Sequence, residues 1–510
     1  MSTLSDLFPE EFSTLSEEWL KSLKSELKID QVDSKTVKKQ LEGGAWPTLS
    51  LGVQNAQHLS VSEVWKKSSQ TYLRLPSKNL EKALIEDLDS GVRVFFFYKQ
   101  YLASEQLNLI CTIFEKFPKK EELLLILLGE ESASVPKTSF KIFDESKFIS
   151  ARIVEEQGGN IVQELGFITR KMILEKSYLI SLFVDSNFFK NIAKIRAAKL
   201  LAKKVQEELA SSEEIKIIAL TSFRDWSLYE RYSNLLRNDA AVASAYIGGA
   251  DYVQSAGYDS LFEIEIDDYQ AHPEHTERSR RMARNTTHIL ALESMLGVVQ
   301  DPSFGSFHLE SLSQYYAKEA WSLMQKTINL DERSCLQYFS ESISSIRNQR
   351  LDNIKMRRHV LAGVNDFPNV KENLNLKHRP KEKFFRSARI FEELRIEMEN
   401  SPVRPKVYLL INGDYAALNA RINFVRNYFE LLGLEVIESR FSDSLKASAD
   451  DFLVLCASDD GYENLKNNLP EFSGEKFIAG KYELNGFKNL FAGQNVYSVL
   501  ESIVQKVRGK

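Results

Sequence analysis

The stretch 411–436, INGDYAALNARINFVRNYFELLGLEV, contains the outline of an α/β unit. The apolar residues 407–411 predict a strand that runs into a turn of small residues, and an amphipathic helix follows that turn. Gly433 then leads into a second predicted strand. This order is typical of a nucleotide- or cofactor-binding unit, yet the turn has no histidine, cysteine, lysine or run of glycines. The sequence therefore predicts a cofactor-binding fold without the side chains that would hold a cofactor.

The pattern continues to the end of the chain. Four apolar runs, KVYLLIN, LEVIES, DFLVLCAS and EKFIAG, predict strands separated by short helices, and YSVLESIVQKV predicts a C-terminal helix. Alternating strands and helices of this length favour a small, open, parallel sheet of the flavodoxin-like, Rossmann-type kind.

Upstream, between 80 and about 370, short apolar runs alternate with helical stretches. Several of these runs are continuous, which is typical of strands buried on both faces. They are 92–98, 123–129, 139–143, 148–154, 178–184, 215–222 and 244–256. Repeated strand–helix units predict a TIM (β/α)8 barrel, with a large doubly wound sheet as the structural alternative.

These patterns divide the chain into four parts. We expect an N-terminal arm that contacts a partner over 1–85, a TIM-barrel domain over 86–370, a linker over 371–401 and the smaller α/β domain over 402–510.

Composition limits the possible functions. The chain has 510 residues and a formal net charge of −5, so no broad basic field attracts nucleic acid. Its three cysteines (Cys111, Cys335 and Cys456) lie far apart, which fits a reducing compartment. The acidic N-terminus does not resemble a secretory signal, and the aliphatic run 123–128 is too short to span a membrane. We therefore expect a soluble, cytoplasmic protein.

The segment 281–321 carries the most specific pattern: R-x-A-R-N-T, E-S, D-P-x-x-G-S, L-E-x-L and A-W occur in this order. It closely resembles the methylmalonyl-CoA mutase family. The further stretches that resemble this family are 187–201, 227–259, 359–367 and 391–395. The GGAD form at 248–251 resembles the small-subunit branch. The resemblance covers roughly 80–505, and it implies a TIM barrel for coenzyme A esters followed by a cobalamin-binding domain.

The resemblance also implies a D-x-H-x-x-G loop for adenosylcobalamin, in which the histidine binds cobalt and the aspartate orients its imidazole. In register with LGLEV, these three positions fall on Ala416, Leu418 and Arg421, and none can serve. Asp414 is out of register, and Asn419 is a poor cobalt ligand. We therefore expect no cofactor-binding residue in this domain, which we interpret as a degenerate cobalamin-binding domain.

Two further family loops are altered. The family's G-x-S-x-L and G-G-x-x-P loops correspond to CASDDGY (456–462) and IAGKYEL (478–484). In the barrel, the family's I-S-G-Y-H-x-x-E-A-G stretch corresponds to 149–159, and its histidine position is Ile153. A second histidine position falls on Gln254. Isoleucine cannot donate a hydrogen bond to a substrate carbonyl, so we expect no catalytic residues.

Other motifs have simple structural interpretations. DPSFGS (301–306) is expected to form a turn, and GGAD to allow close backbone packing at a strand end. HPEH (272–275) offers too few ligands for a metal, so we expect no metal site.

The resemblance favours a structural, non-catalytic small subunit. Its partner would be a large subunit that holds adenosylcobalamin and interconverts (R)-methylmalonyl-CoA and succinyl-CoA. Two alternatives stay open: an active acyl-CoA mutase with altered cofactor binding, and a stand-alone acyl-CoA-binding protein.

Overall fold

The structure is a computed structural model, and the part of the chain that it describes has gaps. The described residues are 25, 38–41, 44–47, 68–72, 80–98, 103–128, 138–144, 148–177, 179–212, 216–265, 273–296, 301–376, 384–441, 447–465, 469 and 471–509. Most of the expected N-terminal arm therefore lies outside the described residues. The described residues of the arm include two antiparallel strands, β1 (Lys38–Leu41) and β2 (Gly44–Pro47), which pair with each other.

The chain forms two compact units, each assembled from separate stretches. The first comprises Met1–Ser222, Arg237–Gly257 and Ala271–Arg347. The second comprises Phe223–Leu236, Tyr258–Gln270 and Asn348–Lys510.

The first unit contains an eight-stranded parallel sheet in the order β6-β5-β4-β3-β10-β9-β8-β7. Its strands are β3 (Ser68–Tyr72), β4 (Val94–Tyr98), β5 (Leu124–Leu128), β6 (Lys141–Asp144), β7 (Ile149–Ser150), β8 (Leu179–Val184), β9 (Lys216–Thr221) and β10 (Tyr252–Gln254). Neighbours in the sheet are also neighbours along the chain, except that the first strand, β3, pairs with the last, β10. No pairing between β6 and β7 occurs among the described residues.

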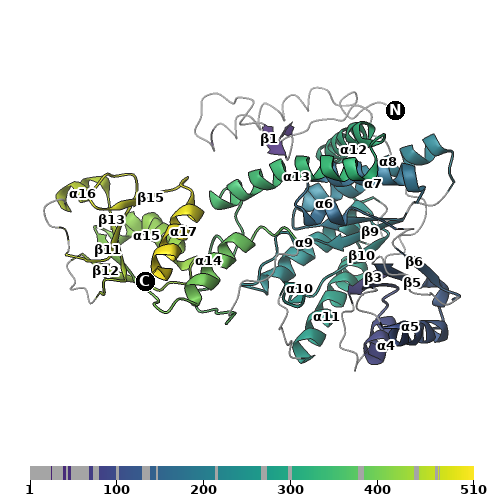
Figure 1. The fold of residues 1–510 in the computed structure, drawn as a ribbon, viewed down its shortest axis with the longest axis horizontal. Coiled ribbons are helices and arrows are strands. Elements are labelled where there is room, and N and C mark those ends of the chain that lie inside the picture. The colour runs from purple at the N-terminus through teal and green to yellow at the C-terminus, as the bar shows by residue number, and fades with distance from the viewer. Residues whose placement is uncertain are drawn as a thin grey trace. The chain divides into compact units, whose positions relative to one another are not determined.

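Helices follow most of these strands (Figure 1). They are α4 (Leu80–Asp89), α5 (Ser104–Lys116), the short 3-10 helix η2 (Lys120–Glu122), α6 (Arg152–Glu156), α7 (Ile161–Glu175), α8 (Phe188–Leu209), α9 (Ser233–Gly248), α11 (Pro273–His288), the π-helical turn η4 (Ile289–Glu293), α12 (Phe307–Thr327) and α13 (Glu332–Lys355). Helix α12 packs on both α7 and α8, as Figure 1 shows.

Apolar side chains show that the eight-stranded sheet is curved. Alternate residues of a strand face opposite sides. One side of β4, β5, β8 and β9 contributes to a single buried cluster, which includes Val94, Ile126, Leu179 and Ile218. In a flat sheet β5 and β8 would be separated by five strand spacings of roughly 4.8 Å each. Contact within one cluster therefore requires the two halves of the sheet to curl toward each other.

The second unit contains a five-stranded parallel sheet in the order β12-β11-β13-β14-β15. Its strands are β11 (Val407–Asn412), β12 (Val436–Arg440), β13 (Phe452–Ala457), β14 (Glu475–Ala479) and β15 (Lys488–Leu490). Numbered within the unit, this is the order 2-1-3-4-5 that characterises flavodoxin-like sheets.

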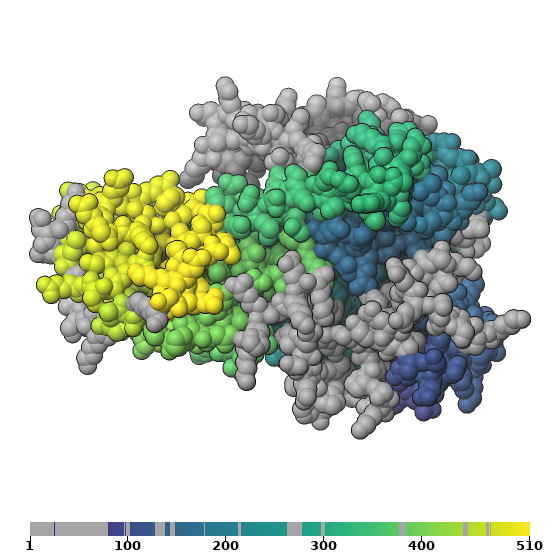
Figure 2. All heavy atoms as spheres, viewed as in Figure 1, coloured from purple at the N-terminus to yellow at the C-terminus, as the bar shows by residue number. Residues whose placement is uncertain are grey.

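Helices cover both faces of this sheet (Figure 1). They are α14 (Arg389–Glu399), α15 (Tyr415–Glu430), α16 (Asp459–Leu465) and α17 (Val496–Arg508), and α10 (Ser260–Glu265) belongs to the same unit. Residues 407, 409 and 411 of β11 pack with α14, α15 and α17, whereas 408 and 410 pack with α16. The C-terminal end of α17, in the brightest yellow of Figure 2, lies at the surface of the unit.

Three elements, one strand and two helices, lie outside the boundaries expected for the two domains. Strand β3 and most of helix α4 fall within the predicted arm, 1–85, and β3 is a full member of the eight-stranded sheet. Helix α14 falls within the predicted linker, 371–401, and its residues Phe391, Leu394 and Met398 are buried in the core of the second unit. No helix in the described ranges combines the length and the apolar character needed to cross a membrane.

Candidate functional site

Polar side chains collect where four strands of the first unit end. Ser150 ends β7, Asp185 follows β8, Ser222 follows β9 and Gln254 ends β10. The carboxyl ends of parallel strands meet at one edge of a sheet, and this edge carries the ligand site in parallel α/β folds. We call the edge defined by these four residues the first carboxyl edge.

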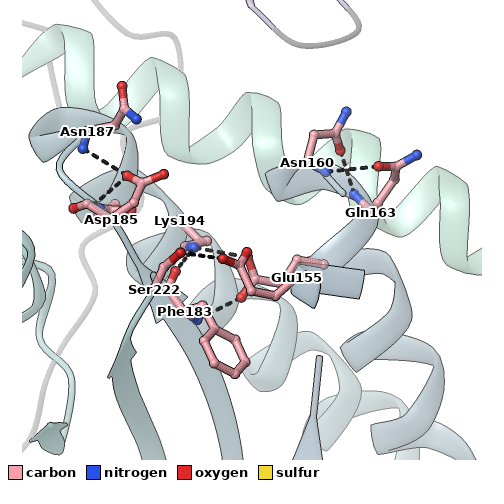
Figure 3. A network of polar contacts seen from close by, with 10 residues as sticks. Glu155, Asn160, Gln163, Phe183, Asp185, Asn187, Lys194 and Ser222 are labelled. Carbon is pink, nitrogen blue, oxygen red and sulfur yellow. Dashed lines mark hydrogen bonds and ion pairs between the residues drawn. The ribbon is translucent and has the colours of Figure 1, made fainter. Parts of the chain in front are cut away.

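A buried ion pair lies just beneath the first carboxyl edge (Figure 3). Lys194 Nζ of α8 is 2.9 Å from Glu164 Oε2 of α7, and each side chain is 5% exposed. The Lys194 ammonium also donates to the carbonyl oxygen of Phe183, whose amide donates to Glu164 Oε1 at 2.8 Å. Burial raises the pKa of the Glu164 carboxyl, and the Lys194 charge opposes that rise. The pair thus fastens two helices to the end of β8.

A second carboxylate reaches this edge from α6. Glu155 Oε1 accepts a hydrogen bond from Ser222 Oγ (Figure 3). The Glu155 charge further raises the pKa of Glu164. Ile153, at the expected histidine position, lies on the same helix and is 39% exposed. An ionised carboxylate only accepts hydrogen bonds. Neither Ile153 nor ionised Glu155 can therefore polarise a thioester carbonyl.

Gln254, at the second expected histidine position, is buried and hydrogen-bonded within the sheet. It is 1% exposed, and its side-chain oxygen accepts from the Thr221 amide at 3.0 Å. The Thr221 hydroxyl donates to the Gln254 carbonyl oxygen at 2.9 Å. Beside it, Asn238 Nδ2 donates to Ser255 Oγ at 2.8 Å. The Gln254 side chain thus joins β9 to β10, so it is a structural group.

The sequence reasoning missed Glu155, Glu164 and Lys194. A signal was present for the last two, because each is a charged residue inside a helical stretch whose neighbours are buried. A charge at such a position needs a partner. The sequence alone does not say which charge meets which.

The expected cofactor loop forms the start of α15 in the second unit. Asp414 is the N-cap, and its side chain accepts from the Ala417 amide at 3.2 Å. Leu418 is 6% exposed and belongs to the core between α15 and the sheet, while Ala416 and Asn419 are exposed. An added Cβ on Gly413 would lie 3.2 Å from Leu418 Cδ1, so the turn packs closely on this leucine.

Arg421 crosses the carboxyl ends of β13 and β14. Its Nη1 donates to the carbonyl oxygen of Ala457, and its Nη2 lies 2.9 Å from Asp459 Oδ1. An added Cβ on Gly480 would lie 3.7 Å from Arg421 Nη1, which places the guanidinium against that glycine. We call this edge, defined by Ala457, Asp459, Gly480 and Arg421, the second carboxyl edge. The Arg421 side chain lies across this edge.

The two altered loops also serve the fold. In CASDDGY, Tyr462 is fully buried, and its hydroxyl donates to the Ala479 carbonyl oxygen at 2.8 Å. In IAGKYEL, the carbonyl oxygens of Gly480 and Tyr482 both accept from Asn489 Nδ2, at 3.0 and 2.7 Å. Each loop therefore forms hydrogen bonds with neighbouring segments of the second unit.

The family-like motif DPSFGS forms a turn, as expected, and it anchors a buried charge cluster. Gly305 has φ +81°, which favours glycine. The Arg196 guanidinium of α8 pairs with Asp301 in this motif and with Glu310 of α12, and all three side chains are nearly inaccessible. Arg284, from the R-x-A-R-N-T run, pairs with the buried Asp87 of α4. These charges hold elements together.

Close packing does occur at GGAD, but at the C-terminal end of helix α9 and not at the strand end that was expected. An added Cβ on Gly248 would lie 3.0 Å from Ile195 Cβ, so α9 packs closely on α8 at this point. Asp251 Oδ2 then accepts from the Ile217 amide at 2.8 Å at the beginning of β9 and β10. Of the HPEH motif, His272 lies outside the described residues. Among the described residues no group of three or more His, Cys, Asp or Glu side chains could hold a metal ion.

Comparison with known proteins supports the family resemblance. Residues 178–428 match the family model described as methylmalonyl-CoA mutase. The methylmalonyl-CoA mutase small subunit of Porphyromonas gingivalis is 30% identical over 311 residues, which cover 55% of this chain and 48% of the relative. The small subunit of Streptomyces virginiae is 29% identical over 355 residues, covering 62% and 55%. A methylmalonyl-CoA mutase of Cereibacter sphaeroides is 30% identical over 253 residues, covering 44% and 33%.

Fold and site together define an α/β protein with a buried ion pair beneath its first carboxyl edge and the Arg421 guanidinium across its second. Over residues 178–428 the chain is similar to the methylmalonyl-CoA mutase family, and it is also similar to the small subunits of that enzyme. It spans about half the length of the curated relatives it matches.

Proposed function

We propose that this chain is a non-catalytic small subunit of a heterodimeric, adenosylcobalamin-dependent methylmalonyl-CoA mutase. Its large subunit would hold the cofactor and interconvert (R)-methylmalonyl-CoA and succinyl-CoA. The role of this chain would be to support that subunit. The observation that carries the proposal is the second carboxyl edge, where Arg421 occupies the place that a cofactor would need.

The residues present do not fit cobalamin. A cobalt ligand must present a nitrogen donor at the edge of the sheet, whereas Leu418 is an aliphatic side chain within the core. The corrin also needs space at the carboxyl edge, where the Arg421 guanidinium bonds to Ala457 and Asp459. Removing Arg421 would leave the Ala457 carbonyl oxygen without this donor. We therefore derive no catalytic step through cobalamin in this chain.

The first carboxyl edge supports the same proposal. Catalysis at a thioester carbonyl needs a hydrogen-bond donor aimed at the developing oxyanion, a contribution of about 3–4 kcal/mol in comparable sites. Ile153 offers none, and Gln254 is engaged with Thr221.

The architecture is proposed in the same terms. We infer that the eight strands of the first unit close into a TIM barrel through β6 and β7, because the strand order is sequential and the sheet is curved. The second unit would then be a degenerate cobalamin-binding domain. The expected cytoplasmic location is supported by Cys111, Cys335 and Cys456, which are all buried and free.

The test is to express this chain alone and together with a large subunit that carries D-x-H-x-x-G. Each preparation is loaded with adenosylcobalamin and freed of unbound cofactor, and its visible spectrum and mutase turnover are recorded. We expect stable one-to-one co-purification, with corrin absorbance and turnover only in the mixture.

Two results would contradict the proposal in different ways. Corrin absorbance or turnover from the isolated chain would favour an active mutase with altered cofactor binding. Binding of an acyl-CoA by the isolated chain, without any association with the large subunit, would favour a stand-alone acyl-CoA-binding protein.

A further inference from the structure

The loop HVLAGVNDF (359–367) in the second unit exposes two large apolar side chains. Phe367 is 77% exposed and Val360 is 53% exposed. Phe367 is also the most exposed of the large apolar side chains in the described part of the chain. A single exposed apolar residue is normal on a protein surface. What distinguishes this loop is the conformation in which the aromatic ring is held.

Phe367 lies in the left-handed region of backbone space, with φ +49°. For a bulky residue this region is uncommon and sterically unfavourable. The next residue is the buried Pro368, and a proline further restricts the residue before it. The chain thus maintains an unfavourable backbone conformation at the same residue that exposes an aromatic ring.

Hydrogen bonds fix the loop in this conformation. Asn365, which is fully buried, accepts from the Leu361 amide at 2.7 Å and donates to the His359 carbonyl oxygen at 2.9 Å. The Gly363 amide donates to the Asp366 carbonyl oxygen at 2.7 Å. The loop is therefore pre-organised.

A second set of contacts ties the aromatic end of the loop to two helices. The Asp366 carboxylate pairs with Arg357 near the end of α13 and accepts from Asn427 of α15. The Phe367 amide donates to the Asn427 side-chain oxygen at 3.2 Å. These bonds fix the backbone on both sides of the ring without covering the ring itself.

In the segment 358–371, which contains the loop, the exposed charged side chains are positive. Arg358 and Lys371 are exposed, whereas the carboxylate of Asp366 is already neutralised by Arg357. The segment therefore combines an aromatic ring with cationic side chains. A second copy of this chain, related by a two-fold axis through this loop, would place like charges opposite each other. A different partner with carboxylates around an apolar pocket fits better.

We propose that Phe367 is an anchor residue that inserts into an apolar, acid-rimmed pocket of the large subunit. This inference rests on the proposed function, because that function supplies the partner. Rigid aromatic anchors at interfaces contribute disproportionately to affinity, since little conformational entropy is lost on binding. The strain at Phe367 is thus stored in the free chain and serves to present the ring.

The test compares three variants of the full chain for binding to the large subunit. Phe367→Gly removes the ring and also relieves the backbone strain, because glycine adopts positive φ freely. Phe367→Ala removes the ring alone. Phe189→Ala removes an equally large ring that is 59% exposed in the first unit and serves as the matched control. Affinity is measured by calorimetry, and the stability of each free chain by urea unfolding.

We expect both Phe367 variants to bind at least about 30-fold more weakly, while Phe189→Ala binds as the wild type does. Free Phe367→Gly should unfold at a urea concentration no lower than the wild type, which separates lost recognition from lost folding. Arg358→Glu should slow association and reduce its dependence on salt.

The outcomes distinguish this inference from the proposed function. If the wild type binds the large subunit and Phe367→Gly binds within threefold of it, this inference fails and the proposed function stands. If the wild type does not bind at all, both fail. Self-association of the wild type that Phe367→Gly abolishes would overturn the inference in favour of a second copy of this chain.

Discussion

At the scale of single residues, the second carboxyl edge is crossed by a side chain of the chain itself. Leu418 and Arg421 lie on the same helix, α15, one facing the core and the other crossing to β13. The leucine contributes to packing, and the arginine satisfies a carbonyl oxygen at the strand end. Both residues therefore have structural roles that a cofactor would disrupt.

The first prediction concerns restoration of the cobalt ligand. Leu418→His alone should not produce cobalamin binding, because Ala416 cannot orient the imidazole and Arg421 still fills the edge. Placing an imidazole at this core position should also lower the free energy of unfolding, by about 2–5 kcal/mol. Equilibrium dialysis against cobalamin and urea unfolding measure the two effects. Tight cobalamin binding by this single variant would contradict our interpretation of the domain.

The second prediction concerns the buried pair of Glu164 and Lys194. Lys194→Met should lower the free energy of unfolding by about 3–5 kcal/mol, because Glu164 is left buried beside Phe183 without its counter-charge. The double variant Glu164→Gln/Lys194→Met should recover much of this loss, because it buries no charge. Urea unfolding of the wild type, Lys194→Met, Glu164→Gln and the double variant gives the coupling energy. A double variant less stable than Lys194→Met would contradict this account.

The third prediction concerns Cys456. Burial raises the pKa of its thiol to about 11, so almost no thiolate exists at pH 8. Burial also raises the pKa of the Cys111 and Cys335 thiols. We expect the native chain to react very slowly with a thiol reagent at pH 8, and all three cysteines to react promptly in denaturant. One fast equivalent in the native chain would show that a thiol is accessible.

At the scale of elements, helix α8 illustrates how family-like motifs act through packing. Its buried part carries Lys194 and Arg196 on different sides of the helix, and they meet partners on α7, on the 301–306 turn and on α12. The helix is therefore fixed on two sides by charge as well as by apolar contacts. The sequence predicted its periodicity, but the partners of these charges are about 30 to 114 residues away along the chain.

The fourth prediction tests the contacts of Arg196 with Asp301 and Glu310. Arg196→Met should lower the free energy of unfolding by about 3–5 kcal/mol, because Asp301 and Glu310 would remain buried as unpaired carboxylates. Lys204→Ala, on the same helix but in an exposed pair with Glu208, should change it little. Urea unfolding at pH 7 measures both. Equal effects of the two substitutions would show that the buried cluster has no special role.

Several elements could be predicted from local patterns alone. The sequence of 160–176 has the pattern of a helix between two apolar runs, and α7 spans Ile161–Glu175. Its start has a local cause, since Asn160 and Gln163 form a reciprocal capping box. In contrast, nothing local marks α14 as part of a core. Its apolar residues Phe391, Leu394 and Met398 could have met solvent, the first unit or the second.

At the scale of the whole molecule, the two units do not follow the chain in simple order. Residues 223–236 follow β9 directly, yet they belong to the second unit. There the Leu228 amide donates to Glu392 Oε1 at 2.7 Å, and the Arg395 guanidinium stacks over the Tyr229 ring at 4.0 Å. Residues 391–395 (FEELR), which supported the family resemblance, therefore bind residues 228 and 229 within the second unit.

The fifth prediction uses this arrangement. Phe391→Ala, at a position 2% exposed in α14, should cost about 3–5 kcal/mol and lower the protection of amides in β11 and β13 against hydrogen exchange. Strands β8 and β9 should keep theirs. Leu312→Ala, also 2% exposed but in the core of the first unit, should have the reverse effect. Equal loss in both sheets would show that the units unfold together.

The sequence by itself predicted the α/β class of each unit and showed which residue types stand at the positions of the family's cofactor ligands. Apolar periodicity is local, so it predicts strands and helices, and a missing histidine at Leu418 or Ile153 is visible without a structure. Only the tertiary structure decided what replaced the site. The pairing of Glu164 with Lys194, the reach of Arg421 to Ala457 and the fixed loop around Phe367 all join residues from different elements. Such contacts depend on how the elements pack, because a side chain's partner is set by distance in space.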